Sequence, residues 1–164
     1  MRHPTFFAKG AVLILLLVLC MSAPHARAQN QTPANIGPVV GAWTDPATGL
    51  TWTKADNGSD VNWNQANAYC TNLRLGGFSD WRLPTIDELQ DIYDPGIDIP
   101  GHKPNGEAVT LHVKGNLRLS STAEWSSSQG SGSGRAWDFY FDDGTRMNVL
   151  YSQWNGWRVL CVRR

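Results

Sequence analysis

The amino-acid sequence predicts an α+β domain in which two short helices pack on a small twisted antiparallel sheet with long loops. Two segments, 62–73 and 81–94, place apolar residues at helical spacing. The segment 135–151 alternates apolar and polar residues around an Asp143-Gly144 turn, as a β-hairpin does. Helical and extended segments do not alternate along the chain, which argues against βαβ units and a parallel sheet.

Both predicted helices begin at a capping residue. Asn62 is a favourable N-cap for the first helix, whose apolar face carries Cys70. Thr85 and Glu88 form an S/T-x-x-E capping box at the start of the second helix. Pro84 keeps the residue before it extended, so the second helix is expected to be short.

The other segments predict strands and loops. Residues 42–53 have the pattern of a strand, a turn and a strand, and residues 157–163 that of a last strand. Residues 95–123 predict long loops with one short strand. The serine- and glycine-rich stretch 126–134 predicts a mobile loop, because it is of low complexity.

The start of the chain has the layout of a cleaved secretory signal. A basic beginning precedes the apolar run 11–21, and small residues two positions apart favour cleavage after Ala28. The run is shorter than the roughly 20 residues that a membrane-spanning helix needs. We expect a bacterial-type export signal at 1–28, a flexible lead at 29–41 and one domain at 42–164. The protein would be periplasmic or secreted, without a membrane span after cleavage.

Composition argues against nucleic acid and anionic membranes as partners. The chain has 14 basic and 14 acidic residues, and three of the basic ones lie in the predicted signal. The mature chain would therefore carry a net charge of −3, which provides no electrostatic footprint for polyanions. A hydrophobic content of 41% with eight tryptophans excludes intrinsic disorder.

Two cysteines remain after the predicted cleavage, Cys70 and Cys161. In an oxidising compartment an isolated pair predicts one disulfide, here between the first helix and the last strand. The alternative is a metal site that combines these cysteines with His102 and His112. Structural zinc sites use short-range ligand pairs such as C-x2-C, and the sequence has none. We expect the disulfide, and neither a metal nor a cofactor.

The polar stretch before the last strand offers a candidate ligand site. Trp154 lies there, and an exposed aromatic ring in a loop can stack on a sugar or a protein ligand. We give equal weight to the alternative that the Trp154 ring packs back onto the sheet. Polar and basic residues of the neighbouring strands are expected on the same face. The full predicted set is Tyr151, Trp154, Asn155, Arg146, Asn148 and Arg158.

Asp142 and Asp143 adjoin this region and could offer oxygens to a weak calcium site. The alternative is a hairpin turn completed by Gly144. The turn is favoured, because Asp-Gly is a common turn sequence.

Six motifs of the chain, taken in order, are similar to those of one known family. They are GLTW (49–52), NWNQANAYC (62–70), GGFSDWRLPTIDELQ (76–90), EWSSS (124–128), AWDFYFDDG (136–144) and RVLCVR (158–163). Together they resemble the Lcl C-terminal domain family, named for the C-terminal domain of a collagen-like bacterial adhesin and long catalogued as a domain of unknown function. The resemblance covers the chain from about Trp43 to Arg164.

This resemblance implies a C-type-lectin-like fold, similar to that of the formylglycine-generating and sulfatase-modifying enzymes. A disulfide from a helix to the last strand is typical of such folds. The named member of the family is an adhesin that binds sulfated polysaccharide. The present chain has no collagen-like repeat and is slightly acidic once the signal is removed. Both features argue against binding of polyanions.

These observations predict an exported, non-catalytic binding or adhesion module for a carbohydrate or protein ligand at the cell envelope. One alternative is a structural envelope protein without a small ligand. The lowest-ranked alternative is an enzyme related to the sulfatase-modifying factors, suggested by RLPT at 82–85. Such an enzyme needs reactive cysteines, which the predicted disulfide would occupy. No catalytic residues are predicted, because G-x-S-x-G, H-E-x-x-H and phosphate-binding glycine loops are missing.

Overall fold

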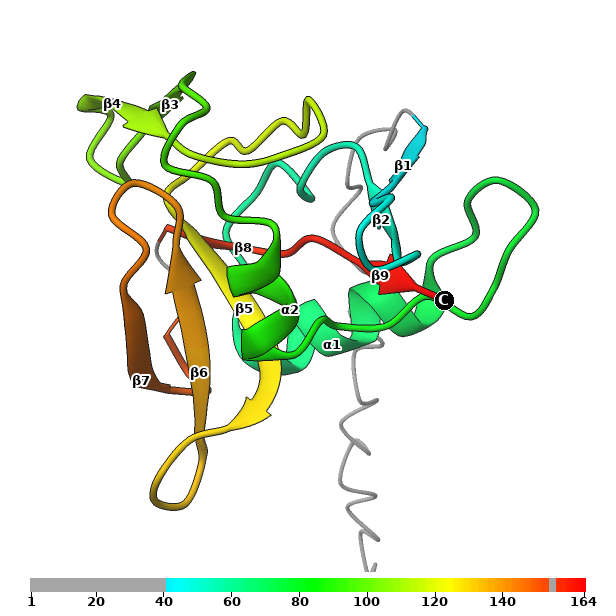
Figure 1. The fold of residues 1–164 in the computed structure, drawn as a ribbon. Coiled ribbons are helices and arrows are strands. Elements are labelled where there is room, and N and C mark those ends of the chain that lie inside the picture. Colours follow the sequence, from blue (N-terminus) through cyan, green and yellow to red (C-terminus); the bar gives the residue numbers. More distant parts are fainter. Residues whose placement is uncertain (1–40, 154–155) are drawn as a thin grey trace, which may run out of the picture. The chain divides into compact units, whose positions relative to one another are not determined.

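The computed structural model describes residues 41–153 and 156–164. Within this range, two helices and nine strands form an α+β domain (Figure 1), as the sequence predicts. The helices are α1 (Trp63–Asn72) and α2 (Ile86–Asp91). The strands are β1 (Ala42–Thr44), β2 (Thr51–Thr53), β3 (Ile99–His102), β4 (Ala108–Leu111), β5 (Ala123–Gln129), β6 (Arg135–Tyr140), β7 (Arg146–Leu150), β8 (Trp157–Arg158) and β9 (Val162–Arg163). The predicted signal at 1–28 lies outside the described residues.

The described strands form three sheets rather than the single sheet expected from the sequence. Four strands have the order β7-β6-β5-β8, three have the order β1-β2-β9, and β3 pairs with β4 alone. The β5–β8 pair is parallel, with Ala123 opposite Trp157, and the other pairs are antiparallel. Sequence patterns predict strands one at a time, so they do not reveal that the chain changes sheets between β8 and β9.

Both helices begin where the sequence predicts, and both begin with a capping box. Asn62 accepts a hydrogen bond from the Gln65 amide (3.0 Å), and the Gln65 side chain accepts one from the Asn62 amide (2.9 Å). Thr85 and Glu88 make the same exchange at α2, at 3.2 and 2.8 Å. These bonds satisfy amide groups that the first turn of a helix otherwise leaves unpaired.

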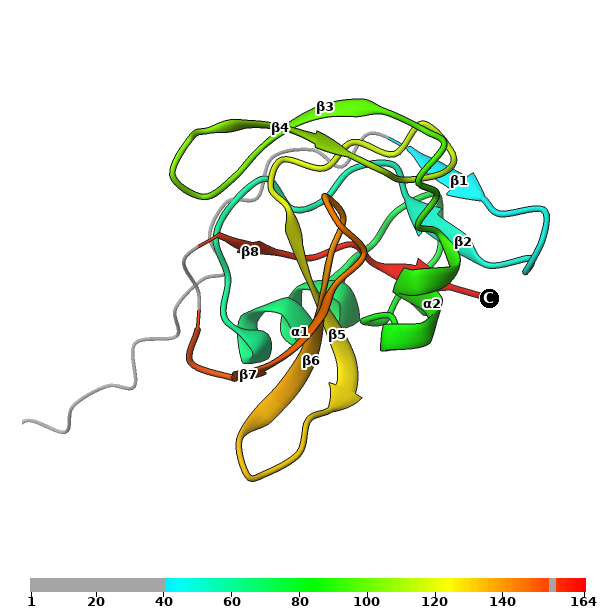
Figure 2. The ribbon, with the colours of Figure 1, turned by 60° about the vertical axis from the view of Figure 1, so that its left-hand side comes forward.

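The two helices lie against opposite faces of the four-stranded sheet. Figure 2 shows α1 and α2 on either side of β5. Along β6, Phe139 packs in the cluster that contains Leu89 of α2, while Ala136 packs in the cluster that contains Cys70 of α1. Alternate residues of one strand therefore serve two cores, and β6 is more deeply buried than the half-buried strand expected from its sequence.

The predicted disulfide between Cys70 and Cys161 is present, with a Cα–Cα distance of 5.4 Å. It joins α1 to the segment between β8 and β9. That segment is not a continuous strand, which corrects the prediction for 157–163. Two side chains replace strand partners there, because the Val159 amide donates to Asn57 Oδ1 (3.0 Å) and the Cys161 amide donates to a threonine hydroxyl, Thr53 Oγ1 (3.2 Å).

The prediction of a mobile loop at 126–134 is wrong for its first four residues, which belong to β5. The serines there have specific partners. Ser126 Oγ donates to the Trp137 carbonyl at 2.6 Å, Ser127 N donates to the Pro84 carbonyl at 2.7 Å, and Ser128 Oγ accepts from the Ile86 amide at 3.0 Å. Small hydroxyl side chains thus fit a central strand when distant backbone groups lie within reach.

The segment 95–123 contains a hairpin of two strands, β3 and β4, where one short strand was expected. Its turn is closed by the Lys103 amide, which donates to the Glu107 carbonyl at 2.8 Å. Gly101 faces Leu111 so closely that a Cβ atom would collide with the leucine. This hairpin brings Lys103 and Pro104 to the pocket described below.

Candidate functional site

Of the residues predicted to form a ligand site, those that the structure describes are not brought together in one place. Arg146 and Asn148 lie on β7, while Arg158 lies on β8, at the opposite edge of the four-stranded sheet. Trp154 and Asn155 lie outside the described residues. The sequence predicts which segments are strands, but their order in the sheet separates residues that were expected on one face.

Each arginine of the predicted set has an acidic partner. Arg146 forms an ion pair with Asp87 of α2 at 2.9 Å. Arg158 contacts the carboxylate of Asp60, and its Nε donates to Ser120 Oγ at 3.0 Å. Both guanidinium groups therefore take part in contacts between elements of the domain.

The two remaining described members also contact other parts of the domain. The ring of Tyr151 stacks on Trp63 of α1, with 4.4 Å between the ring centroids. Asn148 Nδ2 donates to the Ser131 carbonyl at 3.0 Å. Tyr151 thus connects the end of β7 to α1, and Asn148 connects β7 to the loop after β5.

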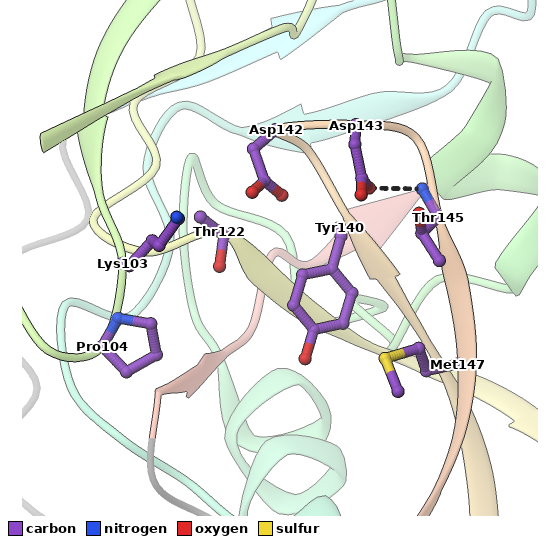
Figure 3. Close-up of a pocket in the computed structure, with 8 residues that line it drawn as sticks. All are labelled: Lys103, Pro104, Thr122, Tyr140, Asp142, Asp143, Thr145 and Met147. Carbon is purple, nitrogen blue, oxygen red and sulfur yellow. Dashed lines mark hydrogen bonds between the residues drawn. The ribbon is translucent and has the colours of Figure 1, made fainter. Parts of the chain in front are cut away.

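A pocket of about 310 Å³ lies where the β6–β7 turn meets the β3–β4 turn (Figure 3). We call it the β6–β7 pocket. Tyr140 and Met147 come from β6 and β7, and Thr122 directly precedes β5. The lining residues are Lys103, Pro104, Thr122, Tyr140, Asp142, Asp143, Thr145 and Met147. Three stretches that are distant in sequence therefore meet at this pocket.

The local sequence explains how Tyr140 reaches the pocket. Phe139 and Phe141 are fully buried in the core on the α2 side, so alternation directs Tyr140 to the other face. The chain then turns at Asp143 and Gly144, where Gly144 has a φ of +77°. Asp143 Oδ1 accepts a hydrogen bond from the Thr145 amide at 2.9 Å, which confirms the predicted turn.

The wall opposite Tyr140 includes Pro104. In Figure 3 the proline ring and the Lys103 side chain lie across the pocket from Met147. The backbone of Gly156 lies against this wall, since a Cβ atom there would collide with Pro104. The segment that leads into β8 thus adjoins the pocket.

Three carboxylates are close enough to Tyr140 to affect its ionisation. Burial, together with the smaller effect of the charges of Asp138, Asp142 and Asp143, raises the pKa of Tyr140 to about 12. The phenol is therefore protonated at neutral pH and can both donate and accept a hydrogen bond. Asp142 Oδ1 is enclosed and has no hydrogen-bond partner within the domain.

Asp138 lies two residues before Tyr140, on the same face of β6, and is fully buried. The indole N–H of Trp157 donates to its Oδ2, while its Oδ1 has no partner. Burial raises the pKa of Asp138 to about 6. At neutral pH this side chain adds a buried negative charge near Tyr140.

The sequence drew attention to two of the lining residues without predicting a pocket. Asp142 and Asp143 were recognised as candidate oxygen donors, and the alternation of β6 separated Tyr140 from its phenylalanine neighbours. Lys103 and Pro104 could not be found, because no periodicity in 95–123 relates them to β6. Across the described residues, no group of three or more histidine, cysteine, aspartate or glutamate side chains is arranged to hold a metal ion.

A family model for the Lcl C-terminal domain matches residues 41–163. The chain belongs to this family. A comparison with curated proteins gives no match. Membership in the Lcl C-terminal domain family agrees with the motif resemblance and suggests an adhesin-like extracellular module.

The described part of this Lcl C-terminal domain protein is compatible with an extracellular location. It contains the Cys70–Cys161 disulfide, a bond that persists in oxidising compartments. Neither of its helices is long and apolar enough to cross a membrane.

Proposed function

We propose that the protein is an exported, non-catalytic adhesion module that holds a sugar residue of a glycan ligand in the β6–β7 pocket. The observation that carries this proposal is the chemical mixture of the pocket lining. Tyr140, Pro104 and Met147 offer apolar surface, while threonine hydroxyls and carboxylates offer hydrogen-bonding oxygens. A sugar ring presents the complementary mixture, apolar C–H faces edged by hydroxyl groups.

The size of the pocket supports a small ligand group. About 310 Å³ is at the lower end of the range for ligand pockets. A single sugar residue fits this space, and the remainder of a glycan would extend over the surface. The turns that build the rim are fixed by hydrogen bonds, so the polar groups are largely preorganised.

The disulfide supports a binding role rather than the enzyme alternative. An enzyme of the sulfatase-modifying type requires reactive thiols, and Cys70 and Cys161 are the cysteines of the described residues. Both are fully buried and bonded to each other. A cysteine that is buried in a disulfide has no free thiol to act as a nucleophile or to bind copper.

The proposal is tested with a glycan array probed by the protein and by its Tyr140→Ala variant, with calcium and with a chelator. Removal of the ring is expected to weaken glycan binding about tenfold or more, because the stacking surface and one hydrogen bond are lost. The matched control is Phe78→Ala, which removes another exposed aromatic ring outside the pocket. Thermal melts of both variants establish that they are folded.

The outcomes separate the alternatives. Binding that is lost in Tyr140→Ala and retained in Phe78→Ala and in chelator supports the pocket. Binding lost in Trp154→Ala and unchanged in Tyr140→Ala moves the site to the loop before β8 and contradicts the pocket. No binding to any glycan favours the structural envelope protein.

A further inference from the structure

We propose that the β6–β7 pocket selects sugar residues that carry a free ammonium group, the class of unacetylated amino sugars. This inference rests on the proposed function and assigns the ligand class of the same pocket. It would set this protein apart from a module that binds sulfated polysaccharide, because the required charges have opposite sign.

The first observation is the pair of carboxylates in the lining. Asp142 and Asp143 both border the pocket, next to the hydroxyl-bearing Thr122 and Thr145 (Figure 3). Asp143 uses one oxygen to fix the turn, through the Thr145 amide. Asp142 Oδ1 has no hydrogen-bond partner, so the domain does not use the full capacity of this carboxylate.

The second, independent observation is a buried carboxylate next to two residues of the lining. Asp138 is fully buried, and its Oδ1 has no partner. It shares a face of β6 with Tyr140, and its partner across the β6–β7 ladder is Met147. Both of these residues line the pocket, so Asp138 is a buried neighbour of the lining.

One cation, Lys103, belongs to the lining, so it offsets only part of the charge of the two carboxylates. Lys103 Nζ forms an ion pair with Glu107 Oε1 at 3.0 Å, and this pair has no net charge. The three aspartates raise the pKa of Tyr140, and no cation contributes in the opposite direction. The potential at the pocket floor is therefore negative, which attracts an ammonium group and repels a sulfate.

The polar rim favours a sugar over the ammonium group of a lysine side chain. Thr122 and Thr145 place hydroxyl groups beside the carboxylates, and Tyr140 adds a third hydroxyl group to the lining (Figure 3). A sugar ring has hydroxyl groups that can pair with them, while a lysine side chain has only methylene groups at these positions. Charge and hydroxyl groups together therefore indicate an amino sugar.

The test is a set of calorimetric titrations near neutral pH with four methyl glycosides that share one ring. They carry an amine, a hydroxyl, an N-acetyl or an N-sulfo group at the same carbon. The amine is expected to bind about tenfold more tightly than the hydroxyl, and the N-sulfo form more weakly than either. The preference for the amine is expected to shrink at high salt, because the pocket is open to solvent.

Isosteric variants assign the preference to the pocket. Asp142→Asn and Asp143→Asn are each expected to reduce the preference for the amine several-fold while leaving binding of the neutral sugar nearly unchanged. The matched control is Asp91→Asn, an exposed carboxylate of α2 on the other side of the four-stranded sheet. This control is expected to keep the full preference.

Equal binding of the amine, hydroxyl and N-acetyl sugars would overturn the inference and leave the proposed function in place. Tighter binding of the N-sulfo sugar would overturn it as well. No binding of any sugar would overturn both. A further probe is lysine methylamide, whose side chain carries a free ammonium group. If it binds as tightly as the amino sugar, the inferred ligand becomes a basic protein partner instead of a sugar.

Discussion

Glu124 and Asp56 form a pair of buried carboxyl groups in the interior of the domain. Glu124 has no exposed surface, and neither of its carboxyl oxygens has a hydrogen-bond partner. Burial raises the pKa of Glu124 well above its usual value, and the neighbouring Asp56 raises it further. Asp56 is held by Ser120 Oγ and by the Gly58 amide, at 2.9 and 2.8 Å. Glu124 therefore stays protonated under conditions where an exposed glutamate is ionised.

This pair predicts that the domain loses stability as the pH rises. The contribution of a group with a raised pKa is fully present below its unfolded-state pKa, here about 4.5, and is lost as the pH passes through the folded-state value. Asp138 acts in the same direction between 3.8 and about 6. Urea unfolding at a series of pH values rising from about 4.5 is expected to show a falling free energy of unfolding, and Glu124→Gln is expected to reduce this fall.

The control for this experiment is Glu107→Gln. Glu107 is exposed, and Lys103 lowers its pKa, so its replacement is not expected to reduce the slope. Asp56 also has a pKa raised by burial, and part of the slope therefore remains in Glu124→Gln. Identical slopes in the protein and in Glu124→Gln would show that Glu124 does not carry the pH dependence.

The sequence predicted the environment of some residues and missed that of others. Tyr140 was separated from Phe139 and Phe141 by alternation alone, since a strand directs successive side chains to opposite faces. The burial of Glu124 was not predicted, because it depends on the parallel neighbour β8 and on Asp56, 68 positions earlier. Local patterns do not contain such distant partners.

At the scale of single elements, the capping box of α1 yields a prediction. Asn62→Ala removes the side chain that accepts a hydrogen bond from the Gln65 amide, and with it one half of the capping box. The free energy of unfolding is expected to fall by about 1 kcal/mol, the usual cost of losing an N-cap. Urea denaturation measures this change.

Asn67→Ala is the matched control, because Asn67 is an exposed asparagine within the same helix. Alanine has a higher helix propensity, so this variant is expected to be neutral or slightly more stable. Equal destabilisation by both substitutions would mean that the cap at Asn62 does not stabilise α1.

Helices and hairpins were predictable because their signals are local. Asn62, Thr85 and the Asp143-Gly144 turn each specify bonds to residues within a few positions. The strand at 126–129 was missed because the serines bond to Pro84 and Ile86, about 40 positions away. Element boundaries set by distant partners leave no periodic signal in the sequence.

For the molecule as a whole, the disulfide joins α1 to the last part of the chain within one of the two cores. It closes a span of 91 positions, and both cysteines are fully buried. Loss of such a bond typically costs about 2–5 kcal/mol. A reductant is expected to lower the melting temperature by about 10 °C.

The control is the double variant Cys70→Ala with Cys161→Ala. It is expected to melt at a lower temperature than the protein and to show no further change with reductant. A protein whose melting temperature is the same with and without the disulfide would contradict the stabilising role of this bond.

The fold class, the disulfide and the family could be predicted from the whole sequence, because they depend on patterns that the chain carries in order. The division into three sheets and the β6–β7 pocket could not. The pocket combines the β3–β4 turn, Thr122 and the β6–β7 turn, and their meeting depends on how the sheets are placed.

The central claim is that a sugar residue occupies the β6–β7 pocket, and the most direct test is a nuclear magnetic resonance titration of the isotope-labelled protein with the methyl glycoside of an amino sugar. The account predicts saturable shifts of backbone and side-chain signals concentrated at Thr122, Tyr140 and Thr145, and their absence in Tyr140→Ala. Shifts centred elsewhere, for example on the exposed Phe78, or no shifts at all, would contradict it.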